Sequence, residues 1–245
     1  MSGQRVSRHL WTGVRIMISL SLLAVLIILC NPAHVWEAVR DASPARLVAA
    51  FLLYLVSMCI VAWRWRMLLH VKGYAIPLGA LVRYYFFGFF FNNFLPSSVG
   101  GDITRIYNVT RHDVSASESF SCVFTERLIG FLAMAVLAVG GVALLISQFV
   151  HEPVIPIATG ILALAFLAVT WVCFDPRWEP FIRRVTNAMP WEKAREIGLR
   201  VYSAVHDYRS HSGALWGAFG VSLIYQFVLG VFTWLVARAM GLDAP

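Results

Sequence analysis

Long apolar runs separated by short polar segments dominate the chain, and this pattern predicts an all-α polytopic membrane protein. Three runs, 128–150, 154–174 and 214–237, contain no Asp, Glu, Lys or Arg and have about the length that a helix needs to cross the hydrocarbon core. Two shorter runs, 16–30 and 47–63, are also expected to span the membrane. With the region between them, we expect about five to seven transmembrane helices.

The region from 75 to 124 does not follow this simple pattern. An apolar run over 75–95 is interrupted at Asn92-Asn93 and Pro96, and only a weak, polar run over 115–124 follows. Two arrangements fit: a re-entrant helix hairpin, or a full crossing followed by a short return helix. We expect some form of hairpin, because the 115–124 segment is too polar to face lipid and needs shielding by other helices.

Basic residues predict the orientation, since they concentrate on the cytoplasmic side of short loops. The N-terminus is basic, and the loop over 175–213 holds seven Lys and Arg residues, so both are expected inside the cell. The chain between Lys72 and Leu128 must then cross an even number of times. After Pro190, apolar residues spaced along one helical face predict an amphipathic helix, either lying in the membrane surface or packed on the protein's own cytoplasmic face.

Composition supports a membrane protein and nominates no catalytic chemistry. The chain is 59% hydrophobic and 13% charged, and its four cysteines and seven histidines are scattered, without a metal-binding, hydrolytic or nucleotide-binding motif. We therefore expect no enzyme activity and no cofactor. The net charge of +7 is interpreted as topology and contact with anionic headgroups rather than nucleic-acid binding.

The polar break is the candidate functional site. Backbone that leaves a helix at membrane depth must be satisfied by protein or a water-filled cavity, so such breaks tend to mark binding or transport sites. Gly100-Gly101 permits a sharp turn that offers consecutive N–H groups to an anion, and Asp102 could cap a half-helix beginning near Ile103. Arg105 would add a full positive charge. The alternative is a tight solvent-facing turn with Arg105 as an interfacial anchor.

Four further charged residues need a partner or an interface. An arginine inside a membrane segment costs about 2.5–3.5 kcal/mol, so Arg83 is expected either to pair with Asp102 or Glu126 or to reach the headgroups. The acidic neighbour of Arg127, Glu126, adds nothing to anchoring and suggests an internal ion pair. Arg64 lies in a Trp-Arg-Trp-Arg segment that is typical of an interfacial belt, with contact to a lipid phosphate as the alternative.

Several of these residues also carry a resemblance to a known family. Ala62-Trp63-Arg64-Trp65, Tyr84-Tyr85-Phe86-x-Gly88, the break from Asn92 to Arg105, and Glu126-Arg127-Leu128-x-Gly130 resemble the flippase-like transmembrane domain of the lysylphosphatidylglycerol synthase family. The resemblance implies a single domain over 1–245, in the inner (plasma) membrane of a bacterium with a cytoplasmic N-terminus, that moves or handles lipids.

The same resemblance limits what can be carried over. In the full lysyl-lipid proteins this domain transfers aminoacylated phosphatidylglycerol between leaflets, while a separate soluble domain makes it. The sequence contains no such soluble domain. Family members usually continue with a second break, whereas this sequence stops at Pro245, so we expect a truncated chain or one that completes its site by self-association.

The expected function is a lipid flippase that binds an anionic phospholipid or an isoprenoid-linked lipid. Asn92, Asn93 and Ser97 would offer hydrogen bonds, the glycine backbone would hold the phosphate, and Arg105 would neutralise it. Asp102, Glu126 and Arg127 would fix the geometry or accept a coupling proton. The rival is a non-transporting subunit that presents lipid to an enzyme of envelope or glycolipid synthesis. The candidate binding residues are Asn92, Asn93, Pro96, Ser97, Gly100, Gly101, Asp102 and Arg105, supported by Arg83, Glu126, Arg127 and Arg64.

Overall fold

The computed structural model describes residues 42–94, 99–149, 153–187 and 192–241, together with Met17, Ser21 and Arg40. All regular secondary structure in these residues is helical, which confirms the all-α prediction. The chain divides into two compact units, 1–51 with 232–245 and 52–231. In the first unit, the backbone N–H of Ser43 donates to the carbonyl of Ala239 at 3.0 Å.

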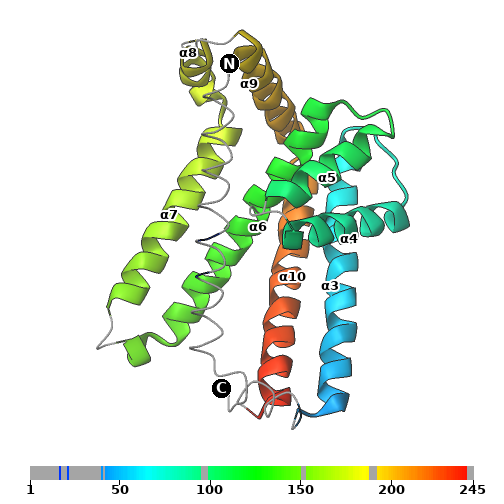
Figure 1. Cartoon of the computed structure of the whole chain (residues 1–245). Helices are drawn as coiled ribbons and strands as arrows, with labels where there is room; N and C mark the ends of the chain where they lie inside the picture. Colours follow the sequence, from blue (N-terminus) through cyan, green and yellow to red (C-terminus); the bar gives the residue numbers. More distant parts are fainter. Residues whose placement is uncertain are drawn as a thin grey trace. The chain divides into compact units, whose positions relative to one another are not determined.

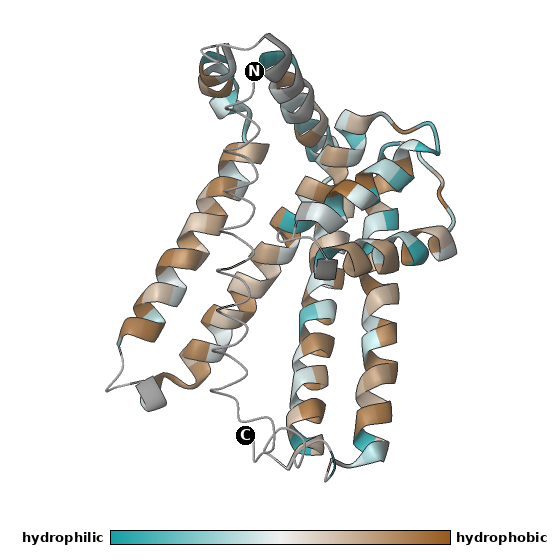
Figure 2. Cartoon of the chain, viewed as in Figure 1, coloured by the Kyte–Doolittle hydropathy of each residue, from teal (hydrophilic) through white to brown (hydrophobic). Residues whose placement is uncertain are grey.

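Four helical stretches among the described residues are long and apolar enough to cross a membrane. In the view of Figure 1, α6 (Ala116–Leu144) descends, α7 (Val154–Phe174) rises and α10 (Ser212–Ala239) descends. Most of their residues are apolar (Figure 2), and on α7 all of them except Ala163 are exposed or partly exposed. Surfaces of this kind need a hydrocarbon surrounding, so the protein is a multi-pass membrane protein. The fourth stretch is α3 (Pro44–Val71).

Two shorter helices, α4 (Leu78–Phe94) and α5 (Val99–Thr110), pack side by side across the long helices (Figure 1). Their backbones approach closely because glycines face each other: a Cβ on Gly101 would collide with the carbonyl oxygen of Gly88. The Asn92 side chain closes the contact by accepting a 2.7 Å hydrogen bond from the Gly101 N–H. Neither helix is among the candidate spans found in the described residues, so the choice between a hairpin and a full crossing stays a prediction. The connection at 95–98 lies outside the described residues.

The expected segments 115–124 and 128–150 form one continuous helix, α6, which ends at Leu144 and is followed by η1 (Ile146–Phe149). Ser115 caps its start by accepting from the Glu118 N–H at 3.2 Å, so polar residues here begin a helix rather than separate two. The polar part is shielded as expected, since Ser119, Ser121 and Cys122 are buried. The other expected spans fall within α3, α7 and α10, except 16–30, which lies outside the described ranges.

The basic loop is largely helical. It contains η2 (Pro176–Trp178), α8 (Glu179–Asn187), α9 (Glu192–His206) and η3 (Asp207–His211). Ala204, Val205 and Tyr208 are buried, and the Tyr208 hydroxyl donates to the Leu68 carbonyl at 3.2 Å. Lys72 adds an ion pair to Asp207 at 2.9 Å. The predicted helix after Pro190 therefore packs on the protein, the second of the two alternatives.

The hydrophobic core lies where α3, α4, α5, α6 and η3 meet. Trp65, Leu68, Leu81, Cys122 and Tyr208 are almost fully buried there. This core fixes the ends of the α4–α5 pair against α3 and α6. The candidate site lies beside this core, and its Arg105 contacts the ring of Trp65.

Candidate functional site

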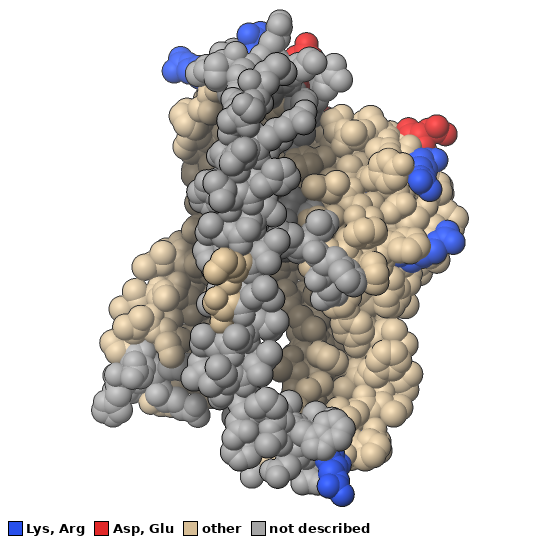
Figure 3. Space-filling view, viewed as in Figure 1, with Lys and Arg blue, Asp and Glu red and all other residues tan. Residues whose placement is uncertain are grey.

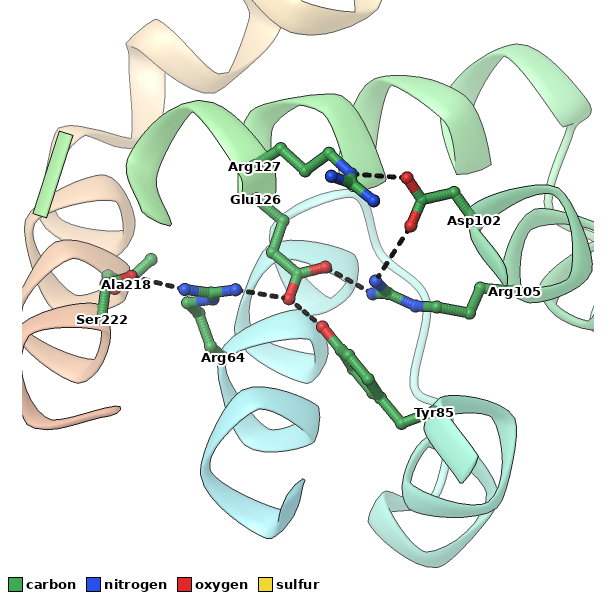
Figure 4. Close-up of polar contacts among 8 residues, drawn as sticks. All are labelled: Arg64, Tyr85, Asp102, Arg105, Glu126, Arg127, Ala218 and Ser222. Carbon is green, nitrogen blue, oxygen red and sulfur yellow. Dashed lines mark hydrogen bonds and ion pairs between the residues drawn. The ribbon is translucent and has the colours of Figure 1, made fainter. Parts of the chain in front are cut away.

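Glu126 of α6 is the centre of a buried charge cluster (Figure 4). Its Oε1 accepts from Nη2 of Arg64 at 2.8 Å and from the Tyr85 hydroxyl, and its Oε2 accepts from Nη2 of Arg105. The side chains are 1% (Glu126), 9% (Arg64) and 8% (Arg105) exposed. One carboxylate thus binds two guanidinium groups and a phenol contributed by α3, α4 and α5.

Two aromatic rings hold Arg105 in place. Its guanidinium carbon lies 4.2 Å from the centroid of the Trp65 ring and 3.8 Å from that of Tyr85. Cation–π contacts of this kind strengthen when the cation is removed from water. The faces of the guanidinium contact the aromatic rings and its edge contacts Glu126, so Arg105 is an internal residue rather than a free anion-binding group.

A second carboxylate, Asp102, connects two arginines. Nε of Arg127 lies 2.5 Å from Asp102 Oδ2, and Nη1 of Arg105 lies 3.7 Å from Asp102 Oδ1. The Arg127 side chain is 39% exposed, the most accessible of the five charged side chains. Asp102 therefore lies between an accessible and a buried arginine.

The cluster extends to α10 through Arg64. Its Nη1 donates to the Ser222 hydroxyl at 2.8 Å, and this hydroxyl donates to the Ala218 carbonyl at 2.8 Å (Figure 4). Gly130 leaves room for the guanidinium, since a Cβ there would lie 3.3 Å from Arg64 Nη1. Five helices thus supply polar groups to one connected network.

A cavity of about 350 Å³ lies beside this network. Its charged lining residues are three arginines and two carboxylates, so the formal charge of the lining is +1. Apolar side chains such as Met58, Phe89 and Leu229 form the rest of the wall with the rings of Tyr54 and Tyr225. A cavity with a net positive end and an apolar wall suits an anionic group attached to an apolar chain. Within the described ranges, no three His, Cys, Asp or Glu side chains are placed to hold a metal ion.

The structure brings together most of the predicted site residues. The residues that line the cavity are Arg64, Asn92, Gly101, Asp102, Arg105, Glu126 and Arg127. Pro96 and Ser97 lie outside the described residues, as does the side chain of Asn93. The predictions for these three therefore stay untested.

The expected cradle of glycine N–H groups differs from the structure. α5 begins at Val99 rather than near Ile103, so Gly100, Gly101 and Asp102 lie in its first turn. The Gly101 N–H is already donated to Asn92, which performs the capping role expected of Asp102. The Gly100 carbonyl accepts from the Thr104 hydroxyl at 3.0 Å.

For Arg83 the structure excludes one of the two expected alternatives, the pairing with Asp102 or Glu126, and for Arg64 the expectation of an interfacial belt was wrong. Arg83 is exposed, and in the described part of the chain it pairs with neither Asp102 nor Glu126, which bind other arginines. Arg64 is buried rather than part of an interfacial belt. Four consecutive residues encircle a helix, so this segment cannot keep one face: Arg64 and Trp65 point inward, whereas Trp63 and Arg66 are exposed.

Sequence reasoning assigned no role to Tyr85 and Ser222. Tyr85 belongs to the Tyr84-Tyr85-Phe86-x-Gly88 segment. The residue one turn further along the helix is Phe89, which gives no indication that Tyr85 has a charged partner. Ser222 is a single hydroxyl within an apolar run, a common and uninformative pattern in membrane helices. Both are recognisable only once the helices are placed.

The fold and the cluster define a class of protein: a multi-pass α-helical membrane protein with an internal ion network beside a cavity. The chain belongs to the lysylphosphatidylglycerol synthase transmembrane region family, whose model matches residues 14–245. This confirms the resemblance seen in the sequence.

Three archaeal proteins are similar to this chain. A UPF0104 membrane protein of Methanothermobacter thermautotrophicus is 24% identical over 91% of this chain and 69% of its own length. Glycosyltransferase AglD of Haloferax volcanii is 28% identical over 55% of this chain and 22% of its own. A UPF0104 membrane protein of Methanocaldococcus jannaschii is 24% identical over 66% of this chain and 46% of its own length. The chain thus spans less than half the length of the second and third of these relatives. No solved structure matches the chain.

Proposed function

We propose that the protein binds the anionic headgroup of a lipid in the 350 Å³ cavity and moves it between the leaflets of the inner (plasma) membrane. The observation that carries this proposal is the buried Glu126 cluster. Ionisable residues at membrane depth are costly and by default indicate a functional site. A purely structural network would not need a cavity with a net positive lining.

The structure suggests how a phosphate would enter the network. Arg127 is the accessible cation, and its partner Asp102 already lies 3.7 Å from Arg105. In the proposed step, the phosphate replaces Asp102 at Arg127 while Asp102 moves fully to Arg105. Arg64 and Glu126 keep their contact throughout and hold the helices together. Arg105 thus acts as a positioning residue, and Arg127 contacts the headgroup.

The proposed orientation follows the charges at the helix ends. The C-terminal ends of α3 and α7 are followed by basic segments. Both ends lie on the same side of the molecule as the start of α10, because α3 and α7 run upward in Figure 1 and α10 runs downward. Basic loops favour the cytoplasmic side. This arrangement supports a cytoplasmic N-terminus if the run at 16–30 crosses once. The α4–α5 pair then enters from the cytoplasmic side.

Reconstitution in liposomes with fluorescent phosphatidylglycerol and a membrane-impermeant quencher tests the proposal. We expect wild-type protein to move the lipid between leaflets and Arg127→Gln to slow the movement about tenfold or more, since one charge-assisted contact of 1.5–3 kcal/mol is lost. Arg105→Ala should abolish it in protein that still inserts. Arg66→Gln, an exposed arginine outside the cavity, is the matched control. Wild-type rates in Arg127→Gln would refute the assigned role.

A second candidate function is a membrane module that presents lipid to a glycosyl-transferring enzyme. It is favoured by the relative named Glycosyltransferase AglD, which matches this chain over 135 residues. In this case, well-folded wild-type protein would move no lipid in liposomes and would co-purify with such an enzyme. These two results together would replace the transport proposal.

A further inference from the structure

The α4–α5 pair has a second hollow on the face opposite the cavity. Gly88 and Gly101 line the cavity on the inner face. On the outer face, Phe87, Phe91 and Ile103 line a groove of about 530 Å³ together with neighbouring residues of α5. The side chains of these three residues are exposed. The two hollows therefore have different linings: the cavity has five charged residues, whereas the groove has mainly aromatic and aliphatic side chains and a single charged residue, Arg111.

Two arginines lie at one end of the groove. Arg111 follows the end of α5 and is part of the groove wall. Arg83 precedes Phe87 by four residues and so lies on the same face of α4. The hydrogen bond between Tyr84 and His112, at 2.9 Å, places the start of α4 beside the end of α5. Both arginines therefore belong to the same end of the pair.

Among the described residues, neither of these arginines forms an ion pair with a carboxylate. Both arginines are exposed. Arg111 lies over the ring of Tyr107, 5.2 Å from its centroid. At the right edge of this view, basic side chains lie on otherwise uncharged surface, and an acidic side chain lies next to them (Figure 3). Asp113 is the nearest acid in sequence and is also exposed.

We infer that the groove is a binding site for one anionic phospholipid, with the phosphate at Arg83 and Arg111 and an acyl chain along Phe87, Phe91 and Ile103. Two cations at headgroup level and an apolar trough leading away from them match the two halves of this ligand. A zwitterionic lipid offers the same chain but little net attraction to the arginines. The occupant is thus selected by charge and held by apolar contact.

This site goes beyond the proposed transport function and does not depend on it. The groove lies on the face of α4–α5 that does not line the cavity, and neither Arg83 nor Arg111 takes part in the Glu126 network. A protein that moves no lipid would still bind phospholipid here. The test therefore measures binding at the groove, not movement.

The experiment is photo-crosslinking in phosphatidylcholine nanodiscs that contain phosphatidylglycerol with a diazirine in its acyl chain. Crosslinked residues are located by peptide mass spectrometry. We expect modification of the peptides that contain Phe87–Phe91 and Ile103–Tyr107. The Arg83→Gln/Arg111→Gln double variant should reduce it about ten- to thirtyfold, as expected for two arginines near a phosphate. Arg66→Gln is the control. Arg83 and Arg111 are both exposed, so the double variant should fold.

The same crosslinker in phosphatidylcholine provides the comparison that decides the result. Preferential crosslinking of phosphatidylglycerol that is lost in the double variant supports the site. Equal crosslinking by the two lipids, or unchanged crosslinking in the double variant, would overturn it and leave only general lipid contact. A liposome experiment without transport bears on the proposed function alone.

Discussion

Replacing Glu126 by glutamine tests how strongly the charge cluster supports the fold. The substitution keeps the shape of the side chain but removes its charge. Arg64 and Arg105 then share no carboxylate, although Arg105 retains Asp102 at 3.7 Å. Arg64 keeps the Ser222 hydroxyl, which is neutral. The variant therefore leaves at least one buried guanidinium without a counter-charge.

The size of the effect follows from burial. Glu126 is 1% exposed and its two partners are less than 10% exposed. Removing one partner from a buried ion pair typically costs about 3–5 kcal/mol, because the remaining charge stays out of water. For a chain of this size each kcal/mol corresponds to about 2–4 °C in Tm. We therefore expect Glu126→Gln to lower the Tm by about 6–20 °C.

The assay is the thermal stability of purified protein in detergent, followed by the loss of the monodisperse peak in size-exclusion chromatography. Glu179→Gln is the matched control, since it makes the same change in an exposed pair with Arg183 that is worth about 0.3–0.5 kcal/mol. A Tm for Glu126→Gln within 2 °C of the control would refute the reasoning, because the arginines would then not depend on the carboxylate for stability.

Two further substitutions test the packing around the site. Gly101→Ala places a Cβ against the Gly88 carbonyl, so we expect α4 to separate from α5, the Tm to fall by several degrees and lipid movement to be lost. Gly79→Ala is the control and should be as stable as the wild type, because a Cβ there would have no atom within 4 Å. Equal Tm values for the two variants would contradict the close approach of the two helices. Tyr208→Phe removes the hydrogen bond to the Leu68 carbonyl and should lower the Tm by about 2–4 °C, whereas an unchanged value would mean that the bond contributes nothing.

The apolar pattern was sufficient to predict the fold class and most of the long helices. The run at 154–174 coincides with α7, because it has a proline before it and an aspartate after it that punctuate the helix. The boundary between 124 and 128 was not predictable in the same way. The residues there form a polar interruption in the sequence, but in the structure they belong to one long helix, α6, in which Thr125, Glu126 and Leu128 are buried.

The sequence was sufficient to predict which charged residues belong to the site, but not which arginine pairs with which carboxylate. Glu126, Asp102 and Arg105 stand out because charges at membrane depth are costly. Which arginine meets which carboxylate depends on helix rotation and on contacts between residues far apart in sequence. Arg64 and Arg83 show this: one was read as exposed and is buried, and the other was read as a possible partner and is exposed.

The distances along the chain within the cluster have a consequence for how the protein is made. Arg64 is synthesised 62 residues before its carboxylate partner Glu126 and 158 residues before Ser222. Until α6 arrives, α3 would carry an uncompensated arginine, which costs about 2.5–3.5 kcal/mol at membrane depth. The insertion of α6 therefore supplies the counter-charge that Arg64 lacks until then. Nascent chains that stop before Glu126 should leave α3 shallow and open to extraction.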